Sequence, residues 1–364
     1  MRILHVTSAL VGGGAETQLK LLMRGLADRG HDVGVVYLYD DPSFNQRDGI
    51  RCVQIERGGK KDLCGLYRRI ATGINDFNPT VVHTWLPEIM TLPAALHARR
   101  VDIPCLSAQR RSLRESLPFK DRMRDWTIAL NHALATRTVC NFSFEREPLL
   151  LRTIIERRKG VVVRNAFQSP DVTATVNPSW LREHSLKLIF VGRLVAQKRV
   201  ELLLQAAAKL RDDGIDVQVG LYGQGTKEGE LKSLAHGLGL IEGESVAFFG
   251  YQPDWQAAAK AYDLFVFPTV AEGMPNVLVE AMGLGLPTLA TNIFEISSFI
   301  QHGEESWLVE PDSAVALYQG ISKLQANQTL CESLALNGQK LADSLSVDHM
   351  VESYVRLYEE MLQT

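Results

Sequence analysis

Short apolar runs alternate with segments of helical periodicity through most of the chain. The first run, Met1–Thr7, leads into glycines at positions 12–14, and Leu19, Leu22 and Leu26 then follow at helical spacing. This is the order strand, glycine turn, helix. Because strands that alternate with helices form parallel sheets covered by helices, the pattern predicts an α/β fold.

The pattern stops once and then begins again. Residues 168–180 (QSPDVTATVNPSW) contain two prolines and little periodicity, which suits a linker, and the apolar run Leu186–Val191 starts a second series. We therefore predict two Rossmann-like domains, 1–168 and 169–345. Residues 346–364 have a continuous apolar stripe and are predicted to form a helix that packs back toward the first domain.

The stretch Ala271–Pro287 (AEGMPNVLVEAMGLGLP) contains a predicted helix start at Pro275. Proline suits the first turn of a helix because its φ is fixed and its missing N–H would lack a partner there. The N–H groups of Met274, Asn276 and Val277, together with the positive end of the helix dipole, would suit a phosphate group.

Two carboxylates flank this helix start. Glu272 precedes the helix, and Glu280 lies about 7 Å along the axis from Pro275, so the two cannot share one proton or one metal ion. Ionised carboxylates accept hydrogen bonds, so they would hold hydroxyl groups at the two ends of a ligand with phosphate in its middle. A nucleotide-sugar has that layout. The alternative is two solvated glutamates beside an ordinary helix start.

Other polar groups follow neighbouring strands of the second half. Arg193 and Lys198 come after the strand Leu186–Val191, and Gly223 and Gly225 come after the next one. The carboxyl ends of parallel strands meet at one edge of a sheet, where ligands bind. Two cations at that edge would clamp a diphosphate. Taken alone, they also fit an ordinary surface loop.

The first half offers less specific signals. Gly12 and Gly14 match the start of a dinucleotide fingerprint, but Thr17 stands where it should close, which disfavours a dinucleotide site. A phosphate or substrate loop and a plain tight turn both remain. His83 is expected to end a strand, where it either contacts a ligand or is simply hydrogen-bonded.

Charge is distributed unevenly. Residues 1–165 carry 26 Lys and Arg against 17 Asp and Glu, or +9; residues 166–364 carry 13 against 25, or −12; together they give the net charge of −3. Residues 109–125 (QRRSLRESLPFKDRMRD), the basic segment, suit either a solvated helix face or a surface for anionic lipid or a lipid-phosphate acceptor. Nucleic acid is not expected, because no aromatic stacking pattern interleaves these charges.

Composition narrows the setting. The five cysteines lack paired or metal-ligand spacing, no leader precedes the first strand, and no apolar run reaches the about 18 to 20 residues that span a bilayer. We expect a cytoplasmic protein with reduced thiols whose membrane contact, if present, is peripheral.

Three motifs together resemble family 4 of the retaining glycosyltransferases: GGGAE after the first strand, GRLVAQKR after the restart, and DLFVFPTVAEGMPNVLVEAMGLGLP. The resemblance covers nearly the whole chain and is strongest over residues 188–287. It implies the GT-B fold, in which two Rossmann-like domains face each other. It also implies transfer of a sugar from a nucleotide-sugar, UDP rather than GDP, to a saccharide or polyprenyl-diphosphate-linked acceptor in surface polysaccharide (lipopolysaccharide included) or glycolipid assembly.

The same resemblance implies roles for individual residues. Arg193 and Lys198 would bind the donor diphosphate, Glu272 the transferred sugar and Glu280 the ribose, with no metal and no cofactor. Arg110 stands where many members carry a histidine, and there it would bind a phosphate on the acceptor, beside His83. Further donor contacts are expected at Gly13, Gly14, Gly223, Tyr251 (near the base), Gly273, Met274, Asn276 and Val277.

Three other functions fit part of this pattern. A nucleotide-sugar epimerase shares the GT-B architecture, and a nucleotide-sugar-binding protein without turnover would use the same contacts. A dehydrogenase is disfavoured by the incomplete glycine fingerprint.

Overall fold

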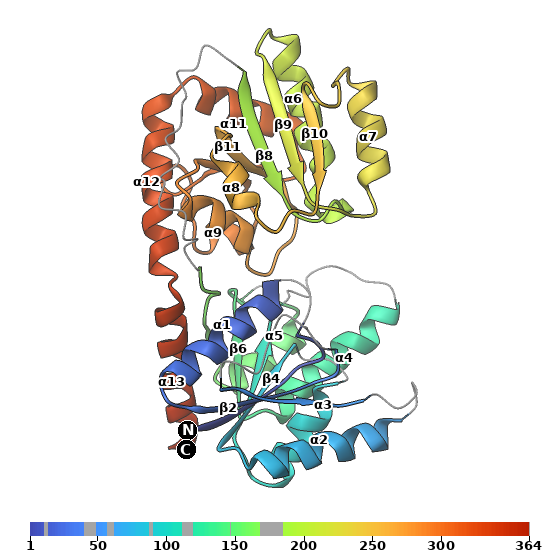
Figure 1. The fold of residues 1–364 in the computed structure, drawn as a ribbon, viewed down its shortest axis with the longest axis vertical. Coiled ribbons are helices and arrows are strands. Elements are labelled where there is room, and N and C mark those ends of the chain that lie inside the picture. The colour runs from blue at the N-terminus through green and yellow to red at the C-terminus, as the bar shows by residue number, and fades with distance from the viewer. Residues whose placement is uncertain are drawn as a thin grey trace. The chain divides into compact units, whose positions relative to one another are not determined.

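The chain forms two compact units, which we call unit 1 (Met1–Ala166 with Val347–Thr364) and unit 2 (Phe167–Ser346). The computed structural model describes residues 1–10, 14–39, 49–56, 62–86, 90–110, 119–145, 147–167 and 185–363, without the side chains of 119–124. Each unit is a parallel sheet flanked by helices (Figure 1). The predicted α/β class is therefore confirmed.

Unit 1 contains seven parallel strands in the order β3-β2-β1-β4-β5-β6-β7. The first strand lies inside the sheet, where Leu4 pairs with Gly34 on one side and with Val82 on the other. The strands are β1 Arg2–Val6, β2 Asp32–Tyr37, β3 Arg51–Gln54, β4 Val81–Trp85, β5 Cys105–Gln109, β6 Arg137–Cys140 and β7 Val161–Val162.

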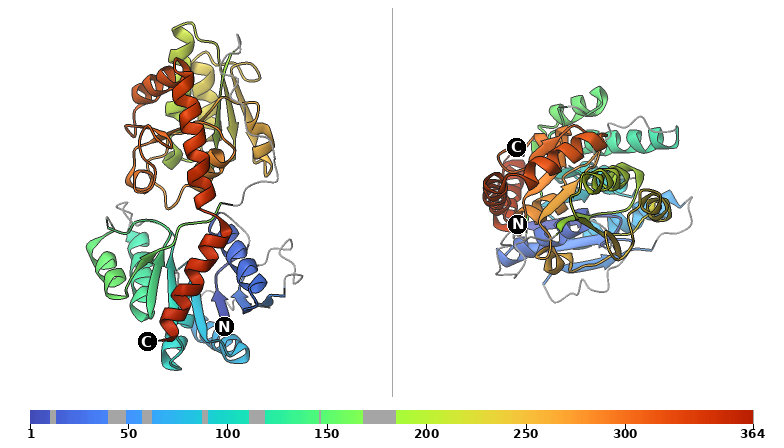
Figure 2. Two further views of the ribbon diagram at one scale, coloured as in Figure 1. Left: turned by 90° about the vertical axis from the view of Figure 1, so that its left-hand side faces the viewer. Right: turned by 90° about the horizontal axis from the view of Figure 1, so that it is seen from above.

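The helices of unit 1 cover both faces of its sheet. Helix α13, at the end of the chain, lies beside α1 (Figure 2) and closes one hydrophobic cluster with it, while α2 and α3 close another. Gly25 of α1 allows this approach, because a Cβ there would lie 2.5 Å from Val351 Cγ2. The helices are α1 Gly14–Asp28, α2 Leu63–Phe77, α3 Leu92–Arg100, α4 Phe119–Leu134, α5 Leu149–Arg157 and α13 Val347–Leu362.

Unit 2 contains six parallel strands in the order β10-β9-β8-β11-β12-β13. They are β8 Leu186–Val191, β9 Val217–Tyr222, β10 Val246–Gly250, β11 Leu264–Phe267, β12 Thr288–Thr291 and β13 Trp307–Val309. The helices are α6 Val200–Asp212, α7 Glu228–Gly237, α8 Trp255–Ala259, α9 Asn276–Gly283, α10 Phe294–Ser297, α11 Ala314–Gln325 and α12 Gln328–Ser344, with a 3-10 turn η2 at Ala196–Lys198.

Both sheets share one topology, which fixes where a ligand would bind. In each unit the first three strands run outward in one direction, and the fourth strand is placed on the other side of the first. The strand order therefore reverses between β1 and β4 in unit 1, and between β8 and β11 in unit 2. Open α/β sheets bind ligands beyond the carboxyl ends of the strands at such a reversal.

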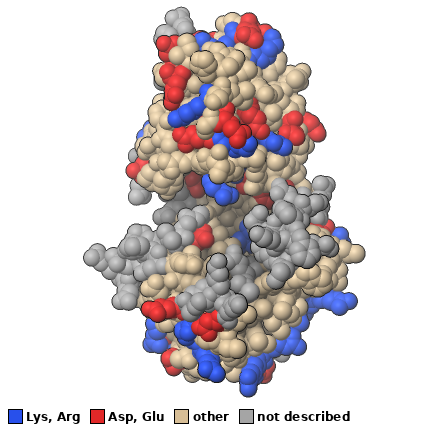
Figure 3. All heavy atoms as spheres, turned by 90° about the vertical axis from the view of Figure 1, so that its right-hand side faces the viewer, with Lys and Arg blue, Asp and Glu red and all other residues tan. Residues whose placement is uncertain are grey.

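Surface charge, the cysteines and the lengths of the helices complete the description of the fold. Lys and Arg side chains lie along the lower part of unit 1 in Figure 3, while Asp and Glu are prominent on the face of unit 2 seen there. All five cysteines are free. In the described ranges, no helix has both the length and the apolar character that crossing a membrane requires.

Candidate functional site

Two loops of unit 2 meet at the point where the strand order reverses. One follows β8 and contains η2, and the other, residues 268–275, connects β11 to α9. Val270 N–H donates to Gln197 O at 3.1 Å, and the Gln197 side-chain amide donates to Ala271 O. These bonds hold the two loops together, and with them the predicted diphosphate and sugar residues.

A buried ion pair joins Lys198 to Glu272 within these loops. Their side chains are 10% and 11% exposed, and Lys198 Nζ contacts Glu272 Oε1. The ammonium group also lies 4.6 Å from the centre of the Phe267 ring. Two charges removed from water are stabilised only when well paired, so either charge alone would be destabilising here. The sequence indicated both residues but not this contact.

Arg193 provides a second cation on the same loop as Lys198. Its side chain is exposed, and within the described part of the chain it has no ion-pair partner. Gly223 follows the neighbouring strand β9, and a Cβ at this position would lie 1.9 Å from Gly192 O. Gly223 thus allows the turns after β8 and β9 to approach, whether or not it also contacts a donor.

The start of α9 differs in detail from the sequence expectation. Pro275 precedes the helix as its N-cap instead of occupying its first position. Asn276 N–H donates to Met274 O at 3.0 Å, so this group is not free for a phosphate as we predicted. Val277 N–H has no acceptor among the described residues, and Gly273 is half-buried beside it. The helix start therefore has fewer available N–H groups than expected.

The two residues predicted to bind the nucleoside lie on different elements. Glu280 is half-buried on α9, and burial raises the pKa of its carboxyl above the ordinary value of 4.5, while hydrogen bonds from Trp255 and Gln256 oppose that shift. Tyr251 follows β10 and is 71% exposed. Trp255 was not identified from the sequence as a partner of Glu280. The feature that could have identified it is its place at the first position of α8.

His83 does not lie at a ligand-binding edge, so its predicted acceptor contact is wrong. It occupies the middle of β4 and is fully buried beneath α13, where Nδ1 is 2.7 Å from the Tyr358 hydroxyl. Its ring also contacts those of His5, Trp85 and Tyr354. Burial lowers the pKa of His83 well below 6.5 and that of His5 to about 3, so both rings are neutral at pH 7.

Arg110 is also buried, at 7% exposed, which contradicts its predicted role in binding an acceptor phosphate. Its guanidinium lies 3.8 Å from the centre of the Trp85 ring and donates to Asn165 Oδ1 at 3.1 Å and to the Tyr354 hydroxyl. These contacts occupy both terminal nitrogens. Arg110 therefore connects the end of β5 to α13. This contact could not be predicted, because 244 residues separate Arg110 from Tyr354 in the chain.

The remaining predictions for unit 1 are largely outside the described residues. Gly13 is among them, and Gly14 is the exposed first residue of α1. Residues 111–118 of the basic segment and the side chains of 119–124 are also outside, so its contact with an anionic membrane stays a prediction. Among the described residues, no group of three His, Cys, Asp or Glu forms a candidate metal site, and metal independence likewise stays a prediction.

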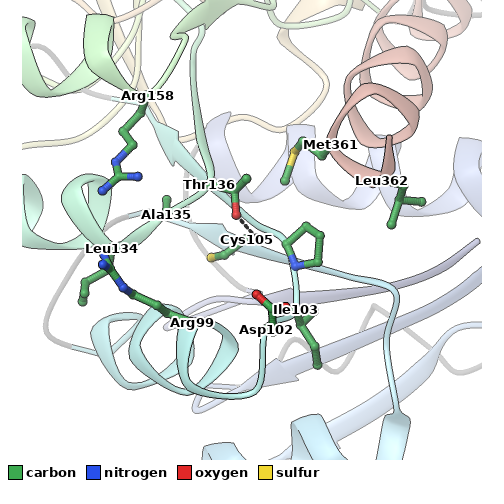
Figure 4. A pocket seen from close by; sticks show the side chains of 11 residues that line it. Arg99, Asp102, Ile103, Cys105, Leu134, Ala135, Thr136, Arg158, Met361 and Leu362 are labelled. Carbon is green, nitrogen blue, oxygen red and sulfur yellow. Dashed lines mark hydrogen bonds between the residues drawn. The ribbon is translucent and has the colours of Figure 1, made fainter. Parts of the chain in front are cut away.

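A pocket of about 590 Å³ lies in unit 1, away from every predicted site residue. It sits at the amino ends of β5 and β6, opposite the edge where open α/β sheets bind ligands (Figure 4). Its lining comprises Arg99, Asp102, Ile103, Pro104, Cys105, Leu134, Ala135, Thr136, Arg158, Met361 and Leu362. Both arginines lie near helix C-termini, where cations offset the helix dipole.

Comparison with known proteins defines the class. The family model described as "Glycosyltransferase Family 4" matches residues 12–168, and that described as "Glycosyl transferases group 1" matches residues 185–327. The matches cover both units, and the chain belongs to this family of glycosyltransferases. The resemblance seen in the motifs is therefore confirmed.

Individual relatives are more distant. The chain is 28% identical over 233 residues to the exopolysaccharide phosphotransferase SCO2592 of Streptomyces coelicolor, a match that covers 59% of this chain and 24% of that protein. It is 22% identical over 321 residues to the UDP-Gal:alpha-D-GlcNAc-diphosphoundecaprenol alpha-1,3-galactosyltransferase of Escherichia coli, covering 83% and 80%.

A solved structure confirms the fold. Anabaena Alr3699/HepE in complex with UDP-glucose superposes with a TM-score of 0.80 at 18% identity, over 98% of this chain and 99% of that one. Together with the two parallel sheets, this likeness confirms the predicted GT-B fold of two Rossmann-like domains.

If Arg110 is part of the core, its removal should destabilise the protein. We expect Arg110→Ala to lower the free energy of unfolding by about 2 kcal/mol or more, because it opens a space beside Trp85 and removes the hydrogen bonds that Arg110 donates to Asn165 and to the Tyr354 hydroxyl. Arg157→Ala, which removes an exposed arginine of α5, should change it by less than about 0.5 kcal/mol. Denaturant titration measures both, and equal stability of the two variants would contradict the assignment.

Glu280 should make stability depend on pH. Its folded pKa is raised, so ionisation is harder in the folded than in the unfolded chain, and stability falls as the pH rises above 4.5. Glu280→Gln cannot ionise, so its melting midpoint should exceed that of the wild type at pH 7, and the gain should shrink as the pH falls toward 4.5. The exposed control Glu244→Gln should show no such trend. A gain that does not depend on pH would argue against this reading.

Proposed function

We propose that the protein transfers a sugar, with retention of anomeric configuration, from a UDP-sugar to a saccharide or polyprenyl-diphosphate-linked acceptor in surface polysaccharide or glycolipid assembly. The observation that carries the proposal is the pairing of Lys198 with Glu272 beside the exposed Arg193, at the strand reversal of unit 2. This places two cations and a carboxylate at the edge where a nucleotide-sugar would lie.

The donor fits this arrangement by charge. A diphosphate carries negative charge, for which Arg193 offers a guanidinium without an ion-pair partner among the described residues, and Lys198 an ammonium group paired on one side. Glu272 then faces the sugar hydroxyls, and Glu280, at the other side of the α9 start, faces the ribose. The crystal structure of Anabaena HepE with UDP-glucose supports a UDP-sugar, since that protein shares the fold.

The chemistry follows from where charge develops. Cleavage of the sugar–phosphate bond places negative charge on the leaving diphosphate, and Lys198 and Arg193 would stabilise it there without reorganisation. The acceptor hydroxyl would attack from the face that the diphosphate leaves, and a phosphate oxygen would take its proton. No protein nucleophile and no metal ion are needed in this scheme.

The acceptor class is supported by relatives and not by a site in unit 1. The E. coli relative is named for a diphosphoundecaprenol-linked acceptor, and the S. coelicolor relative for exopolysaccharide. Because Arg110 and His83 are buried, the proposed acceptor site does not use them. Residues of the glycine loop and of the basic segment remain its candidates.

Substitution of the ion pair tests the proposal. With UDP-galactose or UDP-glucose as donor and GlcNAc-diphosphoundecaprenol as acceptor, Lys198→Met and Glu272→Gln should each reduce transfer at least about a hundredfold, because each removes a preorganised charge. Lys209→Met is the matched control, since Lys209 forms an exposed ion pair with Asp213 in the same unit. Radiolabelled product extracted into solvent measures the rate.

The same assay separates transfer from isomerisation. Without acceptor, the wild type should leave the donor sugar unchanged apart from slow hydrolysis. Donor epimerised in the absence of acceptor would favour the epimerase, and full transfer by both ion-pair variants would refute the proposed site.

A further inference from the structure

The side chain of Thr269 is fully buried at the centre of the two joined loops. Its Oγ1 lies 2.7 Å from Glu272 Oε1, 3.2 Å from Ala271 O and 3.3 Å from Gln197 O. A hydroxyl group has one proton to donate, and the carboxylate is both the nearest acceptor and the charged one. Thr269 therefore donates to Glu272.

This bond leaves the two oxygens of Glu272 in different states. Oε1 accepts from Thr269 and also contacts the Lys198 ammonium group. No described residue donates to Oε2. The Glu272 side chain is 11% exposed, so little of it is open to water. The free acceptor of this carboxylate is thus Oε2, and its direction is set by the donors that hold Oε1.

Thr269 is itself held from two sides. The Thr291 hydroxyl, on the neighbouring strand β12, donates to Thr269 O, and the next residue, Val270, donates its N–H to Gln197 O at 3.1 Å. These two bonds fix the backbone from which the Thr269 hydroxyl reaches Glu272. The orientation of Glu272 is therefore built into the loop and does not wait for a ligand.

We propose that Thr269 is a positioning residue for the donor sugar: its hydroxyl fixes Glu272 so that Oε2 accepts from a hydroxyl of the transferred sugar while Oε1 remains with Lys198. This inference rests on the proposed function, in which Glu272 binds the sugar and the cations bind the diphosphate. It distinguishes the two parts of the donor, because Thr269 contacts the sugar-binding carboxylate but neither cation.

Titration calorimetry with UDP and with UDP-glucose tests this distinction. In Thr269→Val, the dissociation constant for UDP-glucose should rise about tenfold, as expected for a displaced charge-assisted hydrogen bond, while that for UDP should stay within about twofold. Thr269→Ser keeps the hydroxyl and should restore the wild-type ratio of the two constants. If the substitution only disrupted the loop structure, the dissociation constants for UDP and UDP-glucose would rise together.

A second buried threonine provides the matched control. Thr288 is fully buried in β12, and its Oγ1 lies 2.8 Å from Ser306 Oγ, so Thr288→Val removes a buried hydroxyl that does not contact Glu272. Its ratio of dissociation constants should equal that of the wild type.

Three results would overturn the inference: an unchanged ratio in Thr269→Val, an equal loss of UDP and UDP-glucose binding, or failure of Thr269→Ser to restore the ratio. The proposed function fails separately, and this inference with it, if the wild type binds neither ligand or if Glu272→Gln binds UDP-glucose as the wild type does.

Discussion

The bond network between the loops after β8 and β11 is the constraint on which the proposed site depends. The strand order of unit 2 places β8 and β11 side by side. Gln197, which lies 72 residues before Thr269 in the chain, then fastens one loop to the other. The buried ion pair of Lys198 with Glu272 follows from this closeness. Because each of these buried charges needs the other, the ion pair also holds the two loops in their positions relative to each other.

Unit 1 uses a buried cation differently. Arg110 stacks on Trp85 and donates to Tyr354 of α13, and the neutral rings of His5 and His83 fill the space beside them. The C-terminal helix is thereby part of the core of unit 1 although the chain has passed through the whole of unit 2 before reaching it. Polar residues that end or line the strands of unit 1 serve packing here, whereas those of unit 2 lie near an exposed edge.

The fold was largely predictable because its signals are local. Alternating strand and helix patterns gave two α/β domains, and glycines such as Gly223 marked the turns. The candidate site was predictable as residue types at the carboxyl ends of strands, which indicated Lys198 and Glu272. Their direct pairing was not predictable, because it depends on side-chain directions across two loops.

The wrong predictions share one physical cause. Arg110 follows the end of β5 and His83 lies in the middle of β4, and both side chains are covered by α13, a helix more than two hundred residues later in the chain. Whether a polar residue on a strand is exposed depends on such a cover. The prediction that the Asn276 N–H is free for a phosphate was wrong for a local reason, because the turn at Pro275 directs this N–H to Met274 O. Thr269 was overlooked because a threonine after a strand is common. Its place three residues before Glu272 is the signal that would have found it.

The central claim is that the loops after β8 and β11 bind the diphosphate of a nucleotide donor, and hydrogen–deuterium exchange with and without saturating UDP tests it most directly. Backbone N–H groups contacted by phosphate or shielded by it exchange more slowly. We expect slower exchange at residues 192–198 and 272–277 when UDP is bound. Exchange unchanged in both segments, or slowed only in unit 1, would contradict it.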